Sequence, residues 1–123
     1  MQKIMMSGKI HRARLTGCEL DYEGSMEIDL DLLDAAGILP YEKILVVNRE
    51  NASRIETYAI PGARGSKVFC LNGPAAKLGR VGDCVTIIAF SLFDPEEARN
   101  LAPPVIVLDA DNNIIMRKGP KII

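Results

Sequence analysis

The stretch KILVVNRENASRIETYAIP, residues 43–61, contains two strand-like runs separated by a short polar break. Residues 43–50 and 54–61 are rich in β-branched and aromatic side chains, and residues 51–53 lie between them. Two runs of this kind joined by a short polar segment are typical of a β-hairpin. We therefore predict a pair of antiparallel strands in the middle of the chain.

The pattern of short strands between turn residues continues in both directions from this hairpin. Residues 9–15 alternate loosely between charged and apolar positions, and residues 66–72 end at the turn signal Asn72-Gly73-Pro74. Residues 83–93 predict a fully buried strand. Residues 103–118 predict a second hairpin, which turns at Asp111-Asn112-Asn113.

Two short helices interrupt the strands. The first is predicted from about residue 30, with Gly37 as its stop. The second has Asp94 as N-cap and Pro95 at its first position, and it is short because prolines follow at 103 and 104. Because strands outnumber helices, we expect a mainly β protein, a compact β-barrel with short helices.

Length and composition narrow the class of protein. The 123 residues fit one domain, 1–123, and a formal net charge of -1 argues against a nucleic-acid partner. Three cysteines, an odd number with none in a CxxC pair, argue against a disulfide framework or a zinc site. We expect a cytoplasmic protein, since the start shows no signal peptide and the longest apolar run is too short for a bilayer.

The chain has a single histidine, His11, which limits the metal and catalytic sites that it can form. It cannot build a multi-histidine metal site, so we expect no metal. A hydrolase triad would have to use this one imidazole. The sequence also has no GxGxxG and no GxxxxGK[ST], so the usual nucleotide-binding loops are absent.

The pair Gly24-Ser25 in LDYEGS, residues 20–25, has two interpretations. One is an ordinary hairpin turn, because glycine and serine are common turn residues. The other is a reactive peptide bond, since glycine lets its carbonyl be approached closely. The Ser25 hydroxyl would attack the Gly24 carbonyl to give an ester. Loss of the serine α-proton would then cut the chain, and hydrolysis of the resulting dehydroalanine would leave a pyruvoyl group.

Four side chains suggest a site for an acidic substrate. Lys9 and His11 are two apart on a predicted strand and so face one side, and Arg54 and Tyr58, four apart, also share a face. By strict alternation Thr57 points to the other face unless a bulge turns it. Solvated charges, an edge tyrosine and a structural histidine explain the same residues equally well. The pattern alone leaves an enzyme and a binding barrel both open.

Six segments at fixed spacing resemble the pyruvoyl-dependent L-aspartate 1-decarboxylases. The resemblance runs from near residue 3 to about residue 115. The matching segments are GKIHRARLT (8–16), LDYEGS (20–25), DAAGILPYE (34–42), RIETYAIPGARGS (54–66), LNGPAAKLG (71–79) and VGDCVTI (81–87).

This resemblance implies a double-psi β-barrel that is made as an inactive precursor. The precursor would cut itself between Gly24 and Ser25 into a short chain, 1–24, and a long chain, 25–123, in which Ser25 becomes a covalent pyruvoyl cofactor. The resemblance further implies a homotetramer with active sites between neighbouring subunits. The sequence leaves open whether cleavage is spontaneous or needs an activating protein.

The implied reaction converts L-aspartate to β-alanine and CO₂, for pantothenate and coenzyme A synthesis. The pyruvoyl ketone forms a Schiff base with the substrate amine and takes up the electrons released with CO₂. By resemblance, Tyr58 supplies the proton to the carbanion, and Thr57 stabilises the cleavage oxyanion and lines the substrate site. Lys9 and Arg54 pair with the substrate carboxylates, in an order that the sequence does not fix.

The remaining residues implied in the substrate site are His11, Tyr22, Asn72, Gly73, Pro74 and Ala75. The sequence departs from the family pattern at two positions. Pro74 stands where the family usually has alanine and brings no N–H to the site. Ala52 stands where the hairpin usually has glycine, away from the site.

Two other functions are compatible with parts of the sequence. A non-catalytic double-psi barrel that binds a small acidic ligand predicts an uncut chain and no CO₂ release. A small β-rich DNA-binding module is suggested only by the basic start of the chain, and the near-neutral net charge argues against it.

Overall fold

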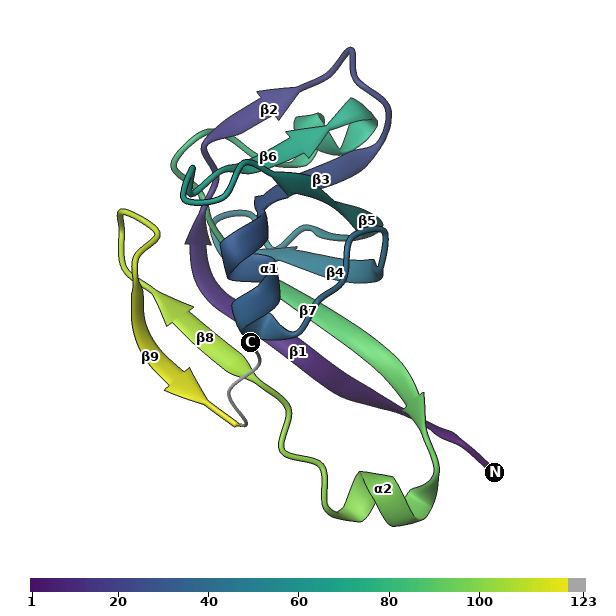
Figure 1. The fold of residues 1–123 in the computed structure, drawn as a ribbon. Coiled ribbons are helices and arrows are strands. Elements are labelled where there is room, and N and C mark those ends of the chain that lie inside the picture. Colours follow the sequence, from purple (N-terminus) through teal and green to yellow (C-terminus); the bar gives the residue numbers. More distant parts are fainter. Residues whose placement is uncertain (120–123) are drawn as a thin grey trace.

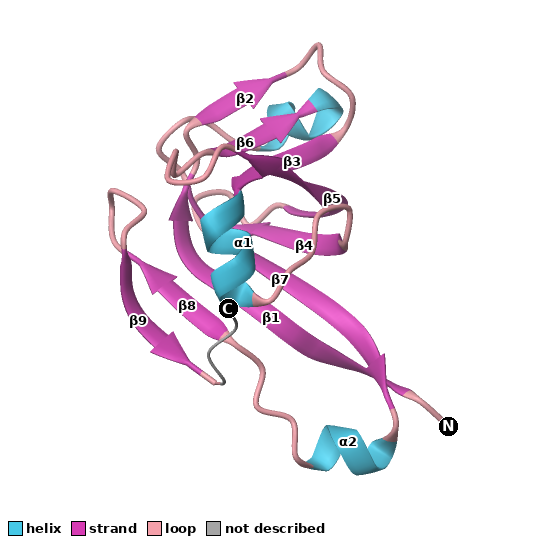
Figure 2. Ribbon diagram, viewed as in Figure 1, coloured by secondary structure: helices cyan, strands magenta, loops and turns pink. Residues whose placement is uncertain are grey.

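A computed structural model describes residues 1–119 and has a mainly β fold with short helices (Figures 1 and 2), as the sequence predicts. The double-psi arrangement stays a prediction. The strands are β1 (Lys3–Arg14), β2 (Gly17–Glu19), β3 (Ser25–Asp29), β4 (Lys43–Asn48), β5 (Arg54–Gly62), β6 (Phe69–Asn72), β7 (Cys84–Phe93), β8 (Val105–Leu108) and β9 (Ile114–Lys118). The helices are α1 (Leu30–Ala36), the 3-10 helix η1 (Gly73–Leu78) and α2 (Pro95–Arg99).

The strands pair in the order β2-β6-β3-β5-β4-β7-β1-β8-β9. Neighbours are antiparallel except for the pairs β2–β6, β3–β5 and β1–β8, which are parallel. Most of these pairs join strands far apart in the sequence. The backbone bonds of the sheet therefore tie the N-terminal quarter of the chain to its middle and to its end.

Both predicted hairpins are confirmed. In the first, β4 and β5 pair from Lys43 opposite Tyr58 to Val47 opposite Arg54 without a register shift. In the second, β8 and β9 pair on either side of a turn in which Asn112 has a positive φ of 61°. Asparagine tolerates this left-handed conformation, which explains why the turn forms there.

Two strand predictions need correction. The strand in residues 83–93 is not fully buried: Phe90 is 44% exposed and Leu92 59% exposed. This half of β7 runs with the start of β1 beyond the other strands, toward α2 (Figure 1), so no core layer covers it. The strand in residues 66–72 begins only at Phe69, because Lys67 before it has a φ of 60°, which no extended strand allows.

Both predicted helices are confirmed. Asp29 caps α1 by accepting a hydrogen bond from the Asp31 N–H at 2.8 Å, and Gly37 ends it in the left-handed conformation, with φ 69°. Asp94 opens α2, and its N–H donates to the Glu97 carboxylate at 3.4 Å. Within residues 1–119, no helix is long and apolar enough to cross a membrane.

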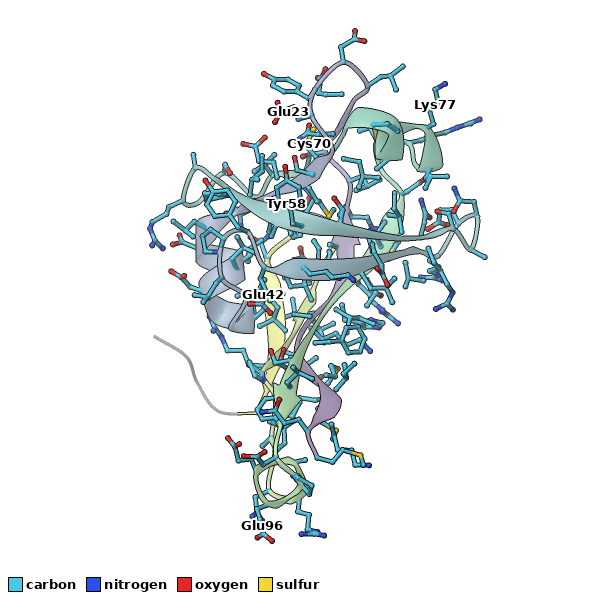
Figure 3. All side chains as sticks on the ribbon, turned by 90° about the vertical axis from the view of Figure 1, so that its right-hand side faces the viewer. Glu23, Glu42, Tyr58, Cys70, Lys77 and Glu96 are labelled. Atoms are coloured by element: carbon cyan, nitrogen blue, oxygen red, sulfur yellow. The ribbon has the colours of Figure 1, made fainter. Side chains whose placement is uncertain are left out.

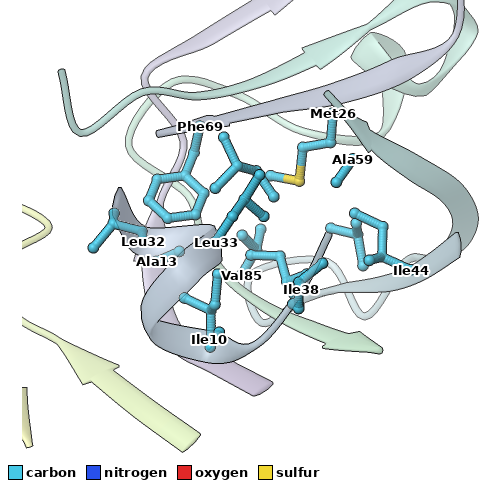
Figure 4. Close-up of a cluster of buried hydrophobic side chains, with 14 of the residues drawn as sticks. Ile10, Ala13, Met26, Leu32, Leu33, Ile38, Ile44, Ala59, Phe69 and Val85 are labelled. Carbon is cyan, nitrogen blue, oxygen red and sulfur yellow. The ribbon is translucent and has the colours of Figure 1, made fainter. Parts of the chain in front are cut away.

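The hydrophobic core lies between α1 and the curved sheet (Figure 4). α1 contributes Leu32 and Leu33, which pack with buried side chains from β1, β3, β4 and β6. The largest of the strand residues include Ile10, Met26, Ile44 and Phe69. This packing anchors β3 and β6, the two strands that carry the candidate site.

Candidate active site

Ser25 is the first residue of β3 and lies at the junction of an exposed loop and a buried strand. Its side chain is 3% exposed, whereas Gly24 before it is exposed, with no atom within 4 Å of the place where a Cβ would stand. The serine is opposite Asn72 of β6 in the antiparallel register. The Gly24–Ser25 peptide therefore has an open side at the glycine and a fixed side chain at the serine.

The hairpin-turn interpretation of Gly24-Ser25 is wrong. β2 and β3, the strands before and after this segment, do not pair with each other, because β6 lies between them in the sheet. β2 is parallel to β6 and β3 is antiparallel to it. The loop from residue 20 to residue 24 therefore passes from one side of β6 to the other.

Asn72 holds the Ser25 hydroxyl directly. The Asn72 Nδ2 amide donates to Ser25 Oγ at 3.0 Å, and both side chains are buried. The serine hydroxyl in turn donates to the carbonyl oxygen of Glu23 at 3.5 Å. The Asn72 side-chain amide therefore lies beside Ser25.

Gly73, Pro74 and Ala75 form the first turn of η1. Gly73 is buried with φ 73°, and a Cβ on it would lie 2.8 Å from both the Cα and the N of Gly24. Pro74 is exposed at the start of the helix, where a missing N–H costs no helical hydrogen bond. Ala75 is buried in the core. The backbone of Gly73 therefore packs against the Gly24 segment.

A cleft of about 820 Å³ lies above Ser25. Of the predicted site residues it brings together Tyr22, Ser25, Tyr58 and Asn72. Figure 3 shows Tyr58 and Cys70 at the same end of the molecule as Glu23 of the Gly24 loop. The full lining is Thr16, Gly17, Glu19, Tyr22, Glu23, Ser25, Glu27, Tyr41, Tyr58, Ile60, Val68, Cys70 and Asn72.

Thr57 does not line this cleft. The regular pairing of β4 with β5 has no bulge at Thr57 or Tyr58, so the two side chains point to opposite faces of β5. Thr57 therefore shares its face with Ala59, which is fully buried in the core. β5 therefore alternates regularly, as the sequence predicts, and no bulge turns Thr57 toward the face of Tyr58.

Lys9 and His11 lie on a different face. Ile10 between them is fully buried in the core, so both neighbours point to the outer side of β1, as predicted. His11 Nδ1 lies 3.3 Å from Thr86 Oγ1 of β7. Neither Lys9 nor His11 lines the Ser25 cleft.

The surroundings of His11 are positively charged. Partial burial, followed by the charges of four neighbouring cations, lowers the pKa of His11 below its ordinary value of 6.5. A pocket of about 260 Å³ lies beside the imidazole. The four cations are Lys9, Arg12, Lys118 and Arg49.

Arg54 and Tyr58 share the exposed face of β5, as predicted, but at different ends. Arg54 is opposite Val47 of β4, and Val47 is opposite Thr86, which contacts His11. Arg54 and His11 thus lie at the two ends of one line of neighbouring residues that crosses β5, β4, β7 and β1. Tyr58 reaches the Ser25 cleft and Arg54 does not.

Cys70 is the residue at this site that sequence reasoning missed. Its buried thiol donates to Asn72 Oδ1 at 3.4 Å, on the side of the amide away from Ser25. Cys70 and Cys84 are buried, whereas Cys18 is half-buried. The two-residue spacing of Cys70 and Asn72, which puts both on one face of a strand, was the available signal.

Metal binding has no candidate here: residues 1–119 hold no group of three or more His, Cys, Asp or Glu side chains arranged to bind an ion. The site residues in the cleft are instead hydroxyls, an amide, a thiol and carboxylates. Such a set can position a small polar group at residue 25 and exchange protons with it.

Comparison with known proteins gives consistent matches. Residues 1–115 match the family model described as "Aspartate decarboxylase". A relative from Moorella thermoacetica is 53% identical over 120 residues, covering 97% of this chain and 94% of its own. A relative from Bacillus subtilis is 52% identical over 119 residues, with the same coverage of 97% and 94%. One from Salinibacter ruber is 52% identical over 114 residues, covering 93% of this chain and 78% of its own. All three are named "Aspartate 1-decarboxylase".

Proposed function

Because the chain belongs to the aspartate decarboxylase family, we propose that it cuts itself at Gly24–Ser25 and then converts L-aspartate to β-alanine and CO₂. The observation that carries this proposal is the setting of Ser25. Its hydroxyl is buried, hydrogen-bonded to Asn72 and beside a cleft, and it follows a glycine with one open side. β-Alanine from this reaction would supply pantothenate and coenzyme A synthesis in the cytoplasm, a setting that suits three free thiols.

The residues around position 25 fit a pyruvoyl group made from Ser25. Such a group needs room above it and a donor for its oxygens. The cleft supplies the room, and the Asn72 amide is a donor beside residue 25, 3.0 Å from the serine Oγ that leaves with the Gly24 carboxylate when the group forms. When formed, the pyruvoyl group serves as the electron sink for decarboxylation in place of pyridoxal phosphate.

Tyr58 is the proposed proton donor to the decarboxylated substrate. This role is supported by the position of Tyr58, which lines the Ser25 cleft from the exposed face of β5. Ile60 of the same strand also lines the cleft. Tyr22 and Asn72 border the same cleft and would orient the substrate. The backbone next to Gly24, at Gly73, would close one side of it.

Lys9 and Arg54 are proposed to bind the carboxylates of L-aspartate, and His11 to border the substrate, from a neighbouring copy of the chain in a homotetramer. Within one copy these cationic and imidazole groups lie on the outer face of the sheet, away from Ser25. The same face carries an apolar groove of about 540 Å³, a feature that marks interaction surfaces. Its lining includes Ile4, Leu45, Phe90 and Leu92.

The role of Thr57 in the cleavage oxyanion rests on the resemblance alone. A side chain on the core-facing side of β5 could act there only if the Gly24 loop or β5 shifts before cleavage. An activating protein also rests on the resemblance alone. Whether such a protein produces this shift would be tested by adding a host extract. Both belong to the activation step and leave the proposed decarboxylation by the mature site unchanged.

Intact-mass analysis of the denatured protein, with a CO₂-release assay on L-aspartate, tests the function. We expect two species, one ending at Gly24 and one starting with a pyruvoyl group at position 25, and we expect CO₂. Ser25→Ala should remain a single full-length chain and release no CO₂. A Ser25→Ala protein that still cuts or decarboxylates would refute the proposal.

The chain contains its own control for the cleavage site. Gly65-Ser66 is a second Gly-Ser pair, but Ser66 is exposed and its Oγ accepts a hydrogen bond from the Val68 N–H at 3.4 Å. We expect no cut there, and Ser66→Ala should process like the original protein. An uncut original protein that also releases no CO₂ after incubation with host extract would favour the binding barrel.

The shared site has a separate test. Arg54→Ala and Ser25→Ala should each be inactive alone. Co-expressed, they can assemble a site with Ser25 from one copy and Arg54 from the other, so part of the activity should return. If no activity returns although mixed oligomers form, Arg54 and Ser25 act within one copy.

A further inference from the structure

A chain of buried hydrogen bonds runs from β6 to the reacting serine. The Cys70 thiol donates to Asn72 Oδ1 at 3.4 Å, and the Asn72 Nδ2 amide donates to Ser25 Oγ at 3.0 Å. Cys70 is 7% exposed and is two residues from Asn72 on the same face of the strand. The asparagine amide thus has one defined partner at each end.

The backbone around Asn72 is already fixed by other contacts. Asn72 is opposite Ser25 in the sheet, and the buried Gly73 after it packs against Gly24. What these contacts leave undetermined is which end of the side-chain amide faces the serine. A half-turn of the amide would point Oδ1 at Ser25 Oγ and replace a donor with an acceptor.

The thiol selects between these two orientations. Burial, followed by the nearby carboxylates, raises the pKa of Cys70 above its ordinary value of 9.0, so the thiol keeps its proton at neutral pH. A protonated thiol can donate only to the carbonyl end of the amide, and its sulfur accepts only weakly from an NH₂ group, so the thiol favours the orientation with Oδ1 facing it. The NH₂ end is thereby left facing Ser25.

We propose that Cys70 is a positioning residue for self-cleavage, which holds the Asn72 amide so that it donates to Ser25 Oγ. This inference rests on the proposed function, since it concerns the step that activates the chain. The thiol does not touch the atoms that react. It acts through Asn72.

The donor at Oγ is suited to the second half of the cleavage chemistry. After the acyl shift, the bond from the Gly24 carbonyl carbon to the Ser25 nitrogen is broken and Oγ is the alkyl oxygen of an ester. In the elimination, the Ser25 α-proton passes to solvent, the Cα–Cβ double bond forms and the Cβ–Oγ bond breaks. Its electron pair stays on Oγ, which becomes part of the Gly24 carboxylate. An N–H aimed at Oγ stabilises the negative charge as it develops there.

The side chain at position 70 also has a limited size. Cys70 Sγ lies 3.0 Å from the place where a Cβ on Gly17 of β2 would stand, so the thiol fills the space between β6 and β2. Serine fits this space and keeps a donor. Alanine is smaller and valine slightly larger, and both lack one. These three replacements separate hydrogen-bond donation from packing.

The test follows precursor loss by intact mass for the original full-length chain and for Cys70→Ala, Cys70→Val and Cys70→Ser. Hydroxylamine added to samples during the reaction cuts the ester and releases a hydroxamate at Gly24, so it reports how much ester has accumulated. We expect Cys70→Ala and Cys70→Val to process about three- to tenfold more slowly, the effect of one lost hydrogen bond, with more ester present. Cys70→Ser should process at about the original rate. Cys18→Ala is the matched control, because its thiol donates to the Gly79 carbonyl and not to the Asn72 amide.

Equal rates and equal ester fractions in the original protein and Cys70→Ala would overturn the inference. Slowing in Cys70→Ser as large as in Cys70→Ala would also overturn it, since a donor would then make no difference. If the Ala and Val variants do not fold, slowing of Cys70→Ser to about a third of the original rate or less overturns the inference. Failure of the proposed function looks different, because the original chain itself would then stay uncut.

Discussion

The backbone of Gly73 lies directly against that of Gly24: a Cβ on Gly73 would come within 2.8 Å of the Gly24 Cα and of its nitrogen. The same Cβ would lie 2.9 Å from the carbonyl oxygen of Tyr22. These are backbone atoms, which cannot move aside as the end of a flexible side chain can. A residue 49 positions along the chain from Gly24 thus sets where the proposed cleavage peptide can lie.

Gly73→Ala should therefore both destabilise the fold and slow the proposed cleavage. The positive φ of 73° costs alanine about 1–2 kcal/mol, and displacement of the Gly24 loop adds to this. Denaturant unfolding and intact mass measure the two effects. Gly65→Ala is the matched control, because Gly65 has a similar φ of 79° and nothing within 4 Å of its Cβ position. Equal effects of the two variants on cleavage would show that the contact with Gly24 is unimportant.

Ala52→Gly should stabilise the protein. Ala52 has φ 60° in the β4–β5 hairpin, where the left-handed conformation strains any residue with a Cβ. Glycine also makes the unfolded chain more flexible, which offsets part of this stabilisation. We therefore expect the free energy of unfolding to rise by about 0.5 kcal/mol. The midpoint of urea unfolding measures it. Ala63→Gly, at an exposed alanine without positive φ, should instead lower stability. A fall in stability for both would contradict the prediction.

Asp29→Ala should be strongly destabilising. This carboxylate is 1% exposed and accepts hydrogen bonds from the N–H groups of Asp31, Gly65 and Lys67 at 2.8, 3.1 and 2.8 Å. Alanine removes a helix cap and leaves buried donors without partners, for a loss of about 3 kcal/mol. Thermal and denaturant unfolding provide the measurement. Asp29→Asn keeps one acceptor oxygen, so its free energy of unfolding should lie between those of the original protein and Asp29→Ala. A loss under about 1 kcal/mol in the alanine variant would mean that water replaces the carboxylate.

His11 should titrate below 6.5, because burial and the charges of Lys9, Arg12, Lys118 and Arg49 all disfavour its protonated form. The unfolded chain then binds a proton more readily than the folded chain does. The contribution of His11 to stability is therefore full above pH 6.5 and falls as the pH drops through this value toward the lower folded pKa. As the chain has one histidine, a single imidazole NMR signal reports the titration.

Lys9→Gln provides the charge test for this titration. Removal of one of the contributing cations should raise the pKa of His11 toward 6.5 without reaching it, because burial remains. Lys77→Gln, on the exposed side of η1, should leave the titration unchanged. An imidazole that titrates at or above 6.5 in the original protein would contradict the predicted direction.

Local signals in the sequence predicted the elements well. The N-cap at Asp94, the stop at Gly37 and the two hairpins depend on residues close together in the chain, so their physics is readable from short windows. The shared faces of Lys9 with His11 and of Arg54 with Tyr58 follow from the two-residue period of a strand. The family resemblance added the roles that spacing could not supply.

Which distant strands pair with each other could not be predicted from such short windows. The sequence by itself determined the two hairpins, the helix caps and most of the strands. Only the tertiary structure decided that β6 separates β2 from β3, which makes the Gly24 segment a crossing loop, and that Asn72 and Cys70 lie beside Ser25. The physical reason is that local conformation depends on a residue's near neighbours. Which strand edges meet depends instead on how the whole apolar surface is buried against α1 and the sheet.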